Sequence, residues 1–268
     1  MVPVITAAVS DDLPTQRKPV VLIRGLAREQ RHWGEFRQLL QQQLPNPVLA
    51  VDLPGMGQAS AQSSPLEISK IAQQLSVSLS QQGLGSCHLL AMSLGAMVAM
   101  SCATLYPQQV ASLVLINSSA AGLTPFYQRL NWRCYPKVLQ ALVTSVAKRE
   151  QLILQLTANN PQIWQQQLPH WQRYGSEIPV SRSNVFRQLL AASRFKLPAK
   201  PSCPVLLLAS RADRLVNWQA SASIARHWQV PLHLHTLAGH DLALDAPYWV
   251  VQHAQQFYQQ FDAASVSA

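Results

Sequence analysis

Six short apolar runs alternate with helical patterns along most of the chain, and this rhythm constrains the fold more than any other feature. The runs span residues 19–25, 47–53, 87–92, 110–117, 204–210 and 231–237. The helical patterns span residues 30–44, 65–82, 94–106, 218–229 and 247–261. Continuous apolar runs bounded by turn residues are typical of strands buried on both faces, and alternation with helices indicates a mainly parallel sheet. We therefore predict an α/β fold with helices on both faces of the sheet.

The alternation of strand and helix patterns stops between Ser118 and Pro198, where amphipathic helical stretches such as residues 138–156 replace the apolar runs. A helical insertion after the fourth strand would lie over the carboxyl ends of the strands, where open α/β sheets bind ligands. We therefore predict a core of residues 1–118 and 199–268, and a helical cap of residues 119–198.

The net charge of the chain is carried by this cap. The 268 residues include 21 Lys and Arg against 12 Asp and Glu, a formal charge of +9. Eleven of the basic residues but only two of the acidic ones lie in residues 120–200, so the rest of the chain is balanced. A basic chain invites comparison with nucleic-acid-binding proteins, but no recognition motif accompanies the charge. We predict no nucleic-acid partner.

Several features indicate a cytoplasmic protein. The first 18 residues have no basic region before their short apolar run, and Asp11 and Asp12 soon follow, which argues against a secretory signal. No apolar stretch reaches the length of a membrane span, so we expect no membrane association. Widely spaced cysteines within apolar runs predict buried thiols in a reducing compartment; they are Cys87, Cys102, Cys134 and Cys203. We expect a monomer or a weak homodimer.

A candidate nucleophile follows the third apolar run. Ser93 lies where the strand at residues 87–92 turns into a helix, with the small residues Ala91 and Gly95 two positions before and after it. This matches the strand–turn–helix pattern G-x-S-x-G, with alanine in place of the first glycine.

A serine nucleophile needs an imidazole to accept its proton and a carboxylate to orient that imidazole. Asp213 follows the strand at 204–210, and His240 follows the strand at 231–237. All three side chains therefore lie at carboxyl ends of predicted parallel strands, where they can meet. The order Ser93, Asp213, His240 predicts a catalytic triad.

Acyl transfer also needs N–H groups directed at the developing oxyanion. The backbone N–H of Leu94, immediately after the nucleophile, is one candidate. The N–H of Leu26 is the second, because Gly25 allows the chain to turn directly after the first strand.

The chain resembles the α/β-hydrolase superfamily and, within it, the capped carboxylesterases similar to pimeloyl-acyl-carrier-protein methyl ester esterase. The resemblance covers nearly the whole chain and is carried by LIRGLAREQRHWGEF, VDLPGMGQAS, LLAMSLGAMVAM, YPQQVASLVLINSS, LLLASRADRLV and LAGHDLALDAPYWV. It implies Ser93 as nucleophile, Asp213 as acid and His240 as base, with Leu26 and Leu94 as oxyanion donors.

Two residues depart from the family pattern. Arg24 stands where the family has histidine before Gly25, and Ala91 replaces a glycine. Neither change removes a catalytic group, because the oxyanion donors are backbone groups. Arg24 either places a cation beside the acyl pocket or pairs with a buried acid such as Asp52.

Substrate choice depends on the cap and on the loop after the first strand. We predict Arg24, Gly25, Leu26 and Trp132 as substrate-binding residues. Further cap aromatics, Phe126, Tyr127 and Tyr135, either line an acyl tunnel or form the cap's own core. The basic cap either docks an acidic acyl carrier protein or is an ordinary solvated surface.

We predict no cofactor and no metal. Residues 52–59 superficially resemble a dinucleotide-binding loop, but Ser60 stands where the pattern needs its third glycine, so a structural turn is preferred. The histidines at 227, 233 and 235 lack acidic partners at metal-ligand spacing.

The sequence thus predicts a serine hydrolase that cleaves carboxylic esters through an acyl-enzyme. Thioester hydrolysis, C–C bond hydrolysis and perhydrolysis are alternatives on the same triad. A non-catalytic ligand-binding protein on the hydrolase scaffold is the alternative from another functional class.

Overall fold

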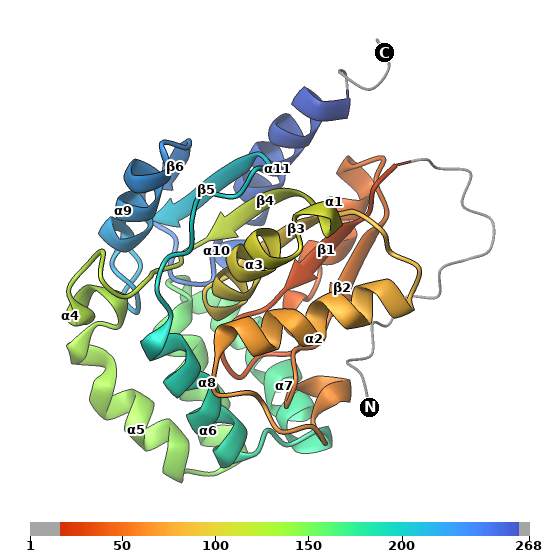
Figure 1. Ribbon diagram of the computed structural model, residues 1–268. Coiled ribbons are helices and arrows are strands. Elements are labelled where there is room, and N and C mark those ends of the chain that lie inside the picture. Colours follow the sequence, from red (N-terminus) through yellow and green to blue (C-terminus); the bar gives the residue numbers. More distant parts are fainter. Residues whose placement is uncertain (1–16, 263–268) are drawn as a thin grey trace.

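The computed structural model describes residues 17–262 and has a single parallel sheet within them (Figure 1). Its strands lie in the order β2-β1-β3-β4-β5-β6, and every neighbouring pair is parallel. The strands are β1 (Val20–Ile23), β2 (Val48–Val51), β3 (Cys87–Met92), β4 (Val110–Ile116), β5 (Val205–Ser210) and β6 (Leu232–His235). The predicted α/β fold is confirmed. The expectation of no secretory signal rests on the first 18 residues, and residues 1–16 lie outside the described residues.

Helices cover both faces of the sheet, which explains why β1–β5 are mainly apolar and buried, whereas the edge strand β6 has the sequence LHLH and is only partly buried. Val21 and Ile23 of β1 pack with one set of helices, and Val20 and Leu22 pack with the other. The first set is α2 (Ile68–Gln81), α3 (Leu94–Leu105) and α9 (Trp218–Trp228); the second is α1 (Phe36–Gln43), α10 (Leu242–Asp245) and α11 (Pro247–Asp262). Figure 1 shows α2 and α3 in front of the sheet and α11 behind it.

The helix predicted for residues 30–44 is interrupted. It consists of a 3-10 turn, η1 (Gln30–Trp33), and the helix α1, with Gly34 between them at φ 51°. This left-handed conformation favours glycine and ends the first turn. Two further 3-10 turns, η2 (Gly57–Ala59) and η3 (Pro107–Gln109), lie in connections.

A group of helices lies between β4 and β5, as the sequence predicts. They are α4 (Phe126–Arg129), α5 (Tyr135–Val143), α6 (Val146–Thr157), α7 (Pro161–Glu177) and α8 (Arg182–Arg194), with a 3-10 turn η4 (Trp132–Cys134). Figure 1 shows them gathered below the sheet. The two ends of this segment meet, because Ala121 N donates to Phe195 O at 2.7 Å. We refer to α4–α8 as the cap; its predicted boundaries at residues 119 and 198 stay a prediction.

The amphipathic stretch at residues 138–156 forms two helices instead of one. Helix α5 ends at Val143, and α6 begins at Val146. Ser145 caps α6 by accepting a hydrogen bond from Lys148 N at 3.4 Å, which favours a new helix start at this point.

The predicted burial of the cysteines is confirmed for three of the four. Cys87, Cys102 and Cys134 are buried free thiols, whereas Cys203 is only half-buried. Burial raises the pKa of Cys87 and Cys102 to about 12, so both are protonated near neutral pH. Separately, none of the helices within residues 17–262 is both long and apolar enough to cross a membrane.

Candidate active site

Ser93 stands at the junction of β3 and α3 in a conformation that side chains rarely adopt. Its φ is 56° and its ψ is −119°. The turn is fixed on both sides: Ser93 N donates to Ile116 O at 2.8 Å, and Ser118 Oγ donates to Ser93 O at 3.2 Å. A residue held in this strained conformation at a strand–helix turn is typical of a nucleophile elbow.

The small residues around Ser93 are required to different degrees. A Cβ on Gly95 would lie 2.4 Å from Arg24 O and 2.6 Å from Ile23 O, both backbone atoms that cannot move away easily. A Cβ on Gly25 would lie 3.0 Å from the Cβ of Ser93. By contrast, Ala91 is fully buried in the strand with its methyl group accommodated. The alanine that departs from the family pattern is therefore compatible with the elbow.

The structure brings Asp213 and His240 together. His240 Nδ1 lies 2.7 Å from Asp213 Oδ2. The other carboxylate oxygen, Oδ1, accepts from Leu215 N at 2.8 Å and Val216 N at 2.9 Å. Both side chains are buried. A carboxylate held this way keeps the imidazole in the tautomer that presents Nε2 as a base.

The pKa of His240 is raised above its ordinary value of 6.5. Burial, the largest single influence, lowers it, but the negative charge of Asp213 and its hydrogen bond outweigh burial, with Asp241 adding to the rise and Arg24 opposing it. The site therefore favours the imidazolium that forms when a base accepts a proton from serine.

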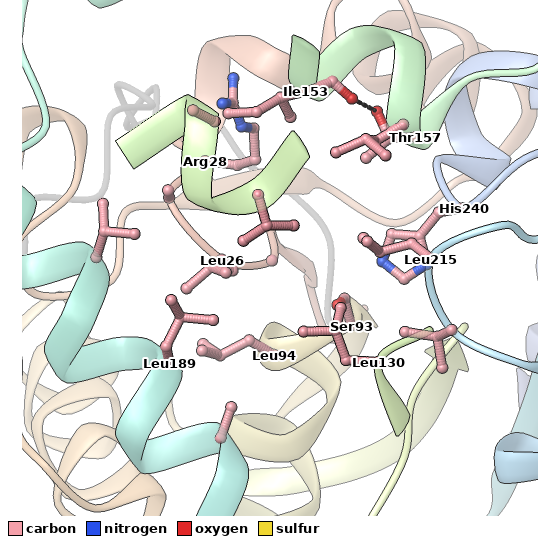
Figure 2. A pocket seen from close by; sticks show the side chains of 18 of the residues that line it. Leu26, Arg28, Ser93, Leu94, Leu130, Ile153, Thr157, Leu189, Leu215 and His240 are labelled. Atoms are coloured by element: carbon pink, nitrogen blue, oxygen red, sulfur yellow. Dashed lines mark hydrogen bonds between the residues drawn. The ribbon is translucent and has the colours of Figure 1, made fainter. Parts of the chain in front are cut away.

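Ser93 and His240 line the same cavity, and Figure 2 shows them side by side there. The predicted oxyanion donors Leu26 and Leu94 line it too. Within the described residues, neither Leu26 N nor Leu94 N donates to another group of the chain, whereas the next amide, Ala27 N, donates to Gln188 Oε1 of α8 at 3.1 Å. All of the residues predicted for the reaction are thus assembled at one place.

The cavity has a volume of about 560 Å³ and lies between the core and the cap. Its walls are mainly apolar side chains, including Met97, Leu130, Leu142, Ile153, Leu189 and Val216. Figure 2 shows Ile153 at the cap side and Leu94 at the core side. An apolar cavity with a few polar groups is typical of a small-molecule site.

The structure decides between the two roles considered for Arg24, but with a different partner. Arg24 is buried and pairs with Asp241, with Nη1 donating to Oδ1 at 3.2 Å and Nη2 donating to Oδ2 at 2.5 Å. Its guanidinium also lies over Trp33, 4.8 Å from the ring centroid. Asp52 instead accepts from Gln30 N and Gln58 N. The suggested pairing with Asp52 is wrong, and the charge of Arg24 is neutralised although the residue lines the cavity.

The structure does not bring Trp132, predicted to bind substrate, to the cavity. Trp132 lies in η4 with 60% of its surface exposed and is not among the residues that line the cavity. Tyr127 is also exposed and away from the cavity, whereas Phe126 and Tyr135 do line it, as do Gly25 and Leu26.

Sequence reasoning missed two residues that position the site. Asn117 Nδ2 donates to His240 O at 2.7 Å, and Asn117 Oδ1 accepts from Ser210 N at 3.0 Å, so this side chain joins the ends of β4 and β5 to the histidine loop. Asp241 holds Arg24, as described above. Asn117 ends a predicted strand, which is the signal that could have found it; the partner of Asp241 had no local signal.

The turn at residues 52–59 is structural, as predicted. A Cβ on Gly57 would lie 2.2 Å from Asp52 Oδ2, and both Gly55 and Gly57 have positive φ. Separately, the described residues contain no group of three or more His, Cys, Asp or Glu side chains that could hold a metal ion.

Comparisons with known proteins agree with this geometry. The model of a family described as "Alpha/beta hydrolase family" matches residues 20–253. A protein from Pseudomonas syringae pv. syringae named "Putative carbamate hydrolase RutD" is 28% identical over 229 residues, which cover 80% of this chain and 81% of that protein.

Solved structures of similar shape include two esterases. The esterase RhEst1 from Rhodococcus sp. ECU1013 is 19% identical with a TM-score of 0.74, and 90% of each chain is covered. A thermophilic esterase from Thermogutta terrifontis is 18% identical with a TM-score of 0.72, over 91% of this chain and 90% of that one. At these identities the likeness shows a shared fold.

Proposed function

This chain is a hydrolase that belongs to the α/β-hydrolase family, and from that premise we propose that it hydrolyses carboxylic esters through a covalent acyl-enzyme on Ser93. The observation that carries the proposal is the 2.7 Å contact between Asp213 and His240, beside an elbow serine in the same cavity. The three groups have the types, order and setting that acyl transfer requires.

The proposed reaction has two halves. His240 takes the proton of Ser93 as Oγ attacks the ester carbonyl, and the N–H groups of Leu26 and Leu94 stabilise the resulting oxyanion. The intermediate collapses, the C–O bond to the alcohol breaks, and His240 gives its proton to the departing oxygen. Water, deprotonated by His240, then attacks the acyl-enzyme and releases the carboxylic acid and free Ser93.

A fluorophosphonate probe tests the nucleophile. We expect wild-type protein to gain the mass of one phosphonyl group on Ser93, and the Ser93→Ala variant to gain none. Absence of labelling in the folded wild type, or equal labelling of the variant, would contradict the proposal and favour the non-catalytic binding alternative.

Carbamate hydrolysis is the second candidate, because the curated relative described above carries that name and aligns over most of both chains. The same triad could attack a carbamate carbonyl. Comparing kcat/KM for an aryl ester and the aryl carbamate of matched size separates the two; we expect the ester to be the better substrate.

The charge of the cap supports an acyl-carrier-protein substrate within the same proposal. Eleven basic residues lie in residues 120–200, and a surface of one sign raises the encounter rate with an acidic partner. We expect kcat/KM for a carrier-linked ester to fall with added salt while that for a small aryl ester does not. Equal salt dependence of both would leave the cap as a solvated surface.

A further inference from the structure

Two arginines and one glutamate line the cavity where the loop after β1 meets the cap. Arg28 comes from that loop, and Arg149 and Glu150 come from α6. The side chains of Arg28 and Glu150 are 6% and 4% exposed, and that of Arg149 is 16% exposed. These charges are therefore largely removed from solvent, where an unmatched charge is costly.

The single carboxylate is shared between the two cations. Arg28 Nη1 donates to Glu150 Oε2 at 2.5 Å, and Arg149 Nε donates to Glu150 Oε1 at 3.2 Å. Both oxygens of Glu150 are thus engaged, yet one positive charge is left over.

The surrounding groups do not neutralise that charge. His32 Nε2 lies 2.8 Å from Arg28 Nη1, but the pKa of His32 is well below its ordinary value because of burial and then the charges of Arg28 and Arg24, so His32 is neutral. The flanking ion pairs carry no excess charge of either sign. Two arginines, Arg31 and Arg173, contact two glutamates, Glu29 and Glu177. Arg24 is paired with Asp241.

Both arginines also keep unused donors. Arg28 Nε and Arg149 Nη2 are buried and, within the described residues, have no hydrogen-bond partner. Guanidinium groups bind carboxylates through paired, charge-assisted hydrogen bonds. The excess positive charge, carried by two arginines that line the cavity, is therefore suited to an anionic ligand.

The position of this pair relative to the triad indicates which part of an ester would carry the anion. His240 must protonate the leaving alcohol, so that alcohol lies beside His240 and the acyl chain extends away from it. Figure 2 shows Arg28 and His240 at opposite sides of the pocket, with Leu26 between Arg28 and Ser93. Apolar side chains, among them Leu26 and Ile153, line the space between.

We infer that Arg28 and Arg149 bind a carboxylate at the far end of the acyl chain, so that the preferred substrate is a monoester of a free dicarboxylic acid, in place of the carrier-linked ester considered above, whose far carboxyl is joined to the carrier. This inference rests on the proposed function for the scissile ester. The apolar wall accommodates the methylene chain, and Glu150 holds both guanidinium groups in place while leaving the site one net positive charge.

Binding without turnover tests the inference. In the Ser93→Ala background, isothermal titration compares the mono-N-methylamides of C4 to C10 dicarboxylic acids with the N-methylamides of the matching monocarboxylic acids. We expect the carboxylate to strengthen binding at least about tenfold at the best length, the equivalent of about 1.4 kcal/mol. Arg149→Gln should remove most of this preference, and Arg149→Lys, which keeps the charge, should retain part of it.

Arg173→Gln is the matched control, because it removes one cation of the same region from a side chain that is 65% exposed and does not line the cavity. It should leave the preference unchanged. The inference is overturned if the carboxylate gives no preference in the parent, if Arg149→Gln preserves it, or if Arg173→Gln reduces it equally. Since no turnover is needed, failure of the fluorophosphonate test would count against the proposed function alone, and loss of the preference alone would count against this inference.

Discussion

The core and the cap of this molecule solve different problems. In the core, the proposed acid and base are held by hydrogen bonds: Asp213 accepts three, and His240 O accepts one from Asn117 Nδ2. In residues 120–200, which contain the cap, basic residues exceed acidic ones by nine, and two buried arginine nitrogens of the cap, Arg129 Nε and Arg149 Nη2, have no hydrogen-bond partner within the described residues. The difference indicates that the core fixes the chemistry, whereas the cap holds the capacity to choose a ligand.

The largest expected effect lies in the core. Asp213→Asn should lower kcat for a small aryl ester by about 10⁴-fold, because the amide no longer fixes the imidazole tautomer or stabilises the imidazolium. Glu177→Gln, which removes an acid from the cap surface, should change kcat less than twofold. A loss below tenfold in Asp213→Asn would show that the dyad is not used.

The buried charges of the cap interface should matter for stability. Glu150→Gln leaves Arg28 and Arg149 without their shared carboxylate and should lower the free energy of unfolding by about 3–5 kcal/mol. Urea denaturation measures this free energy. The control is Glu177→Gln at a more exposed side chain, which should lower the free energy of unfolding by about 1 kcal/mol or less. Equal costs for the two variants would contradict the distinction between buried and surface pairs.

Packing at the elbow should be the next most sensitive feature. Gly95→Ala forces a methyl group against two backbone carbonyls and should lower the free energy of unfolding by about 1–3 kcal/mol. The matched control is Gly85→Ala, since a Cβ there meets nothing within 4 Å. Thermal unfolding of the two variants gives the comparison; similar melting temperatures would show that the elbow tolerates a side chain.

Backbone strain at Ser93 should have a smaller effect on stability, and here the change to glycine should stabilise the fold. Ser93→Gly should be more stable than Ser93→Ala by about 1 kcal/mol, because glycine adopts φ near 56° without the cost that a Cβ imposes. Both variants should be inactive. Urea denaturation of the pair isolates the backbone contribution, and a less stable glycine variant would argue against strain.

The smallest expected effect is a shift in pH dependence. His240 must be neutral to accept a proton, and its pKa is raised above 6.5, so kcat/KM should fall as pH drops through a value above 6.5. The contribution of His240 to stability has the opposite pH dependence: the protonated form is favoured in the folded state, and this stabilisation is lost as pH rises through the folded pKa. A fall in kcat/KM with its midpoint below pH 6.5 would contradict the raised pKa of His240.

The parts that the sequence predicts well are those with local signals. Buried parallel strands are recognised as apolar runs, and Ser93 and Asp213 each follow such a strand, while His240 follows the alternating edge strand β6. Their convergence comes from topology alone. The oxyanion candidates are backbone groups, and their position also depends only on where a strand ends.

The parts that could not be predicted depend on contacts between distant residues. Arg24 meets Asp241 across 217 positions, and Arg28 meets Glu150 across 122, and no short pattern indicates either pair. The orientation of Trp132 depends on how short cap segments pack, which aromatic content does not determine. The break between α5 and α6 did have a local signal, the capping residue Ser145, which the apolar periodicity obscured.

The central claim is that Ser93 carries the acyl group during turnover. It is tested most directly by quenching the enzyme with acid during steady-state hydrolysis of an aryl ester and analysing the digested protein by mass spectrometry. We expect the peptide containing Ser93 to carry the mass of the acyl group, and the Ser93→Ala variant to carry none and to hydrolyse the ester at the background rate. Undiminished hydrolysis by Ser93→Ala would contradict the account.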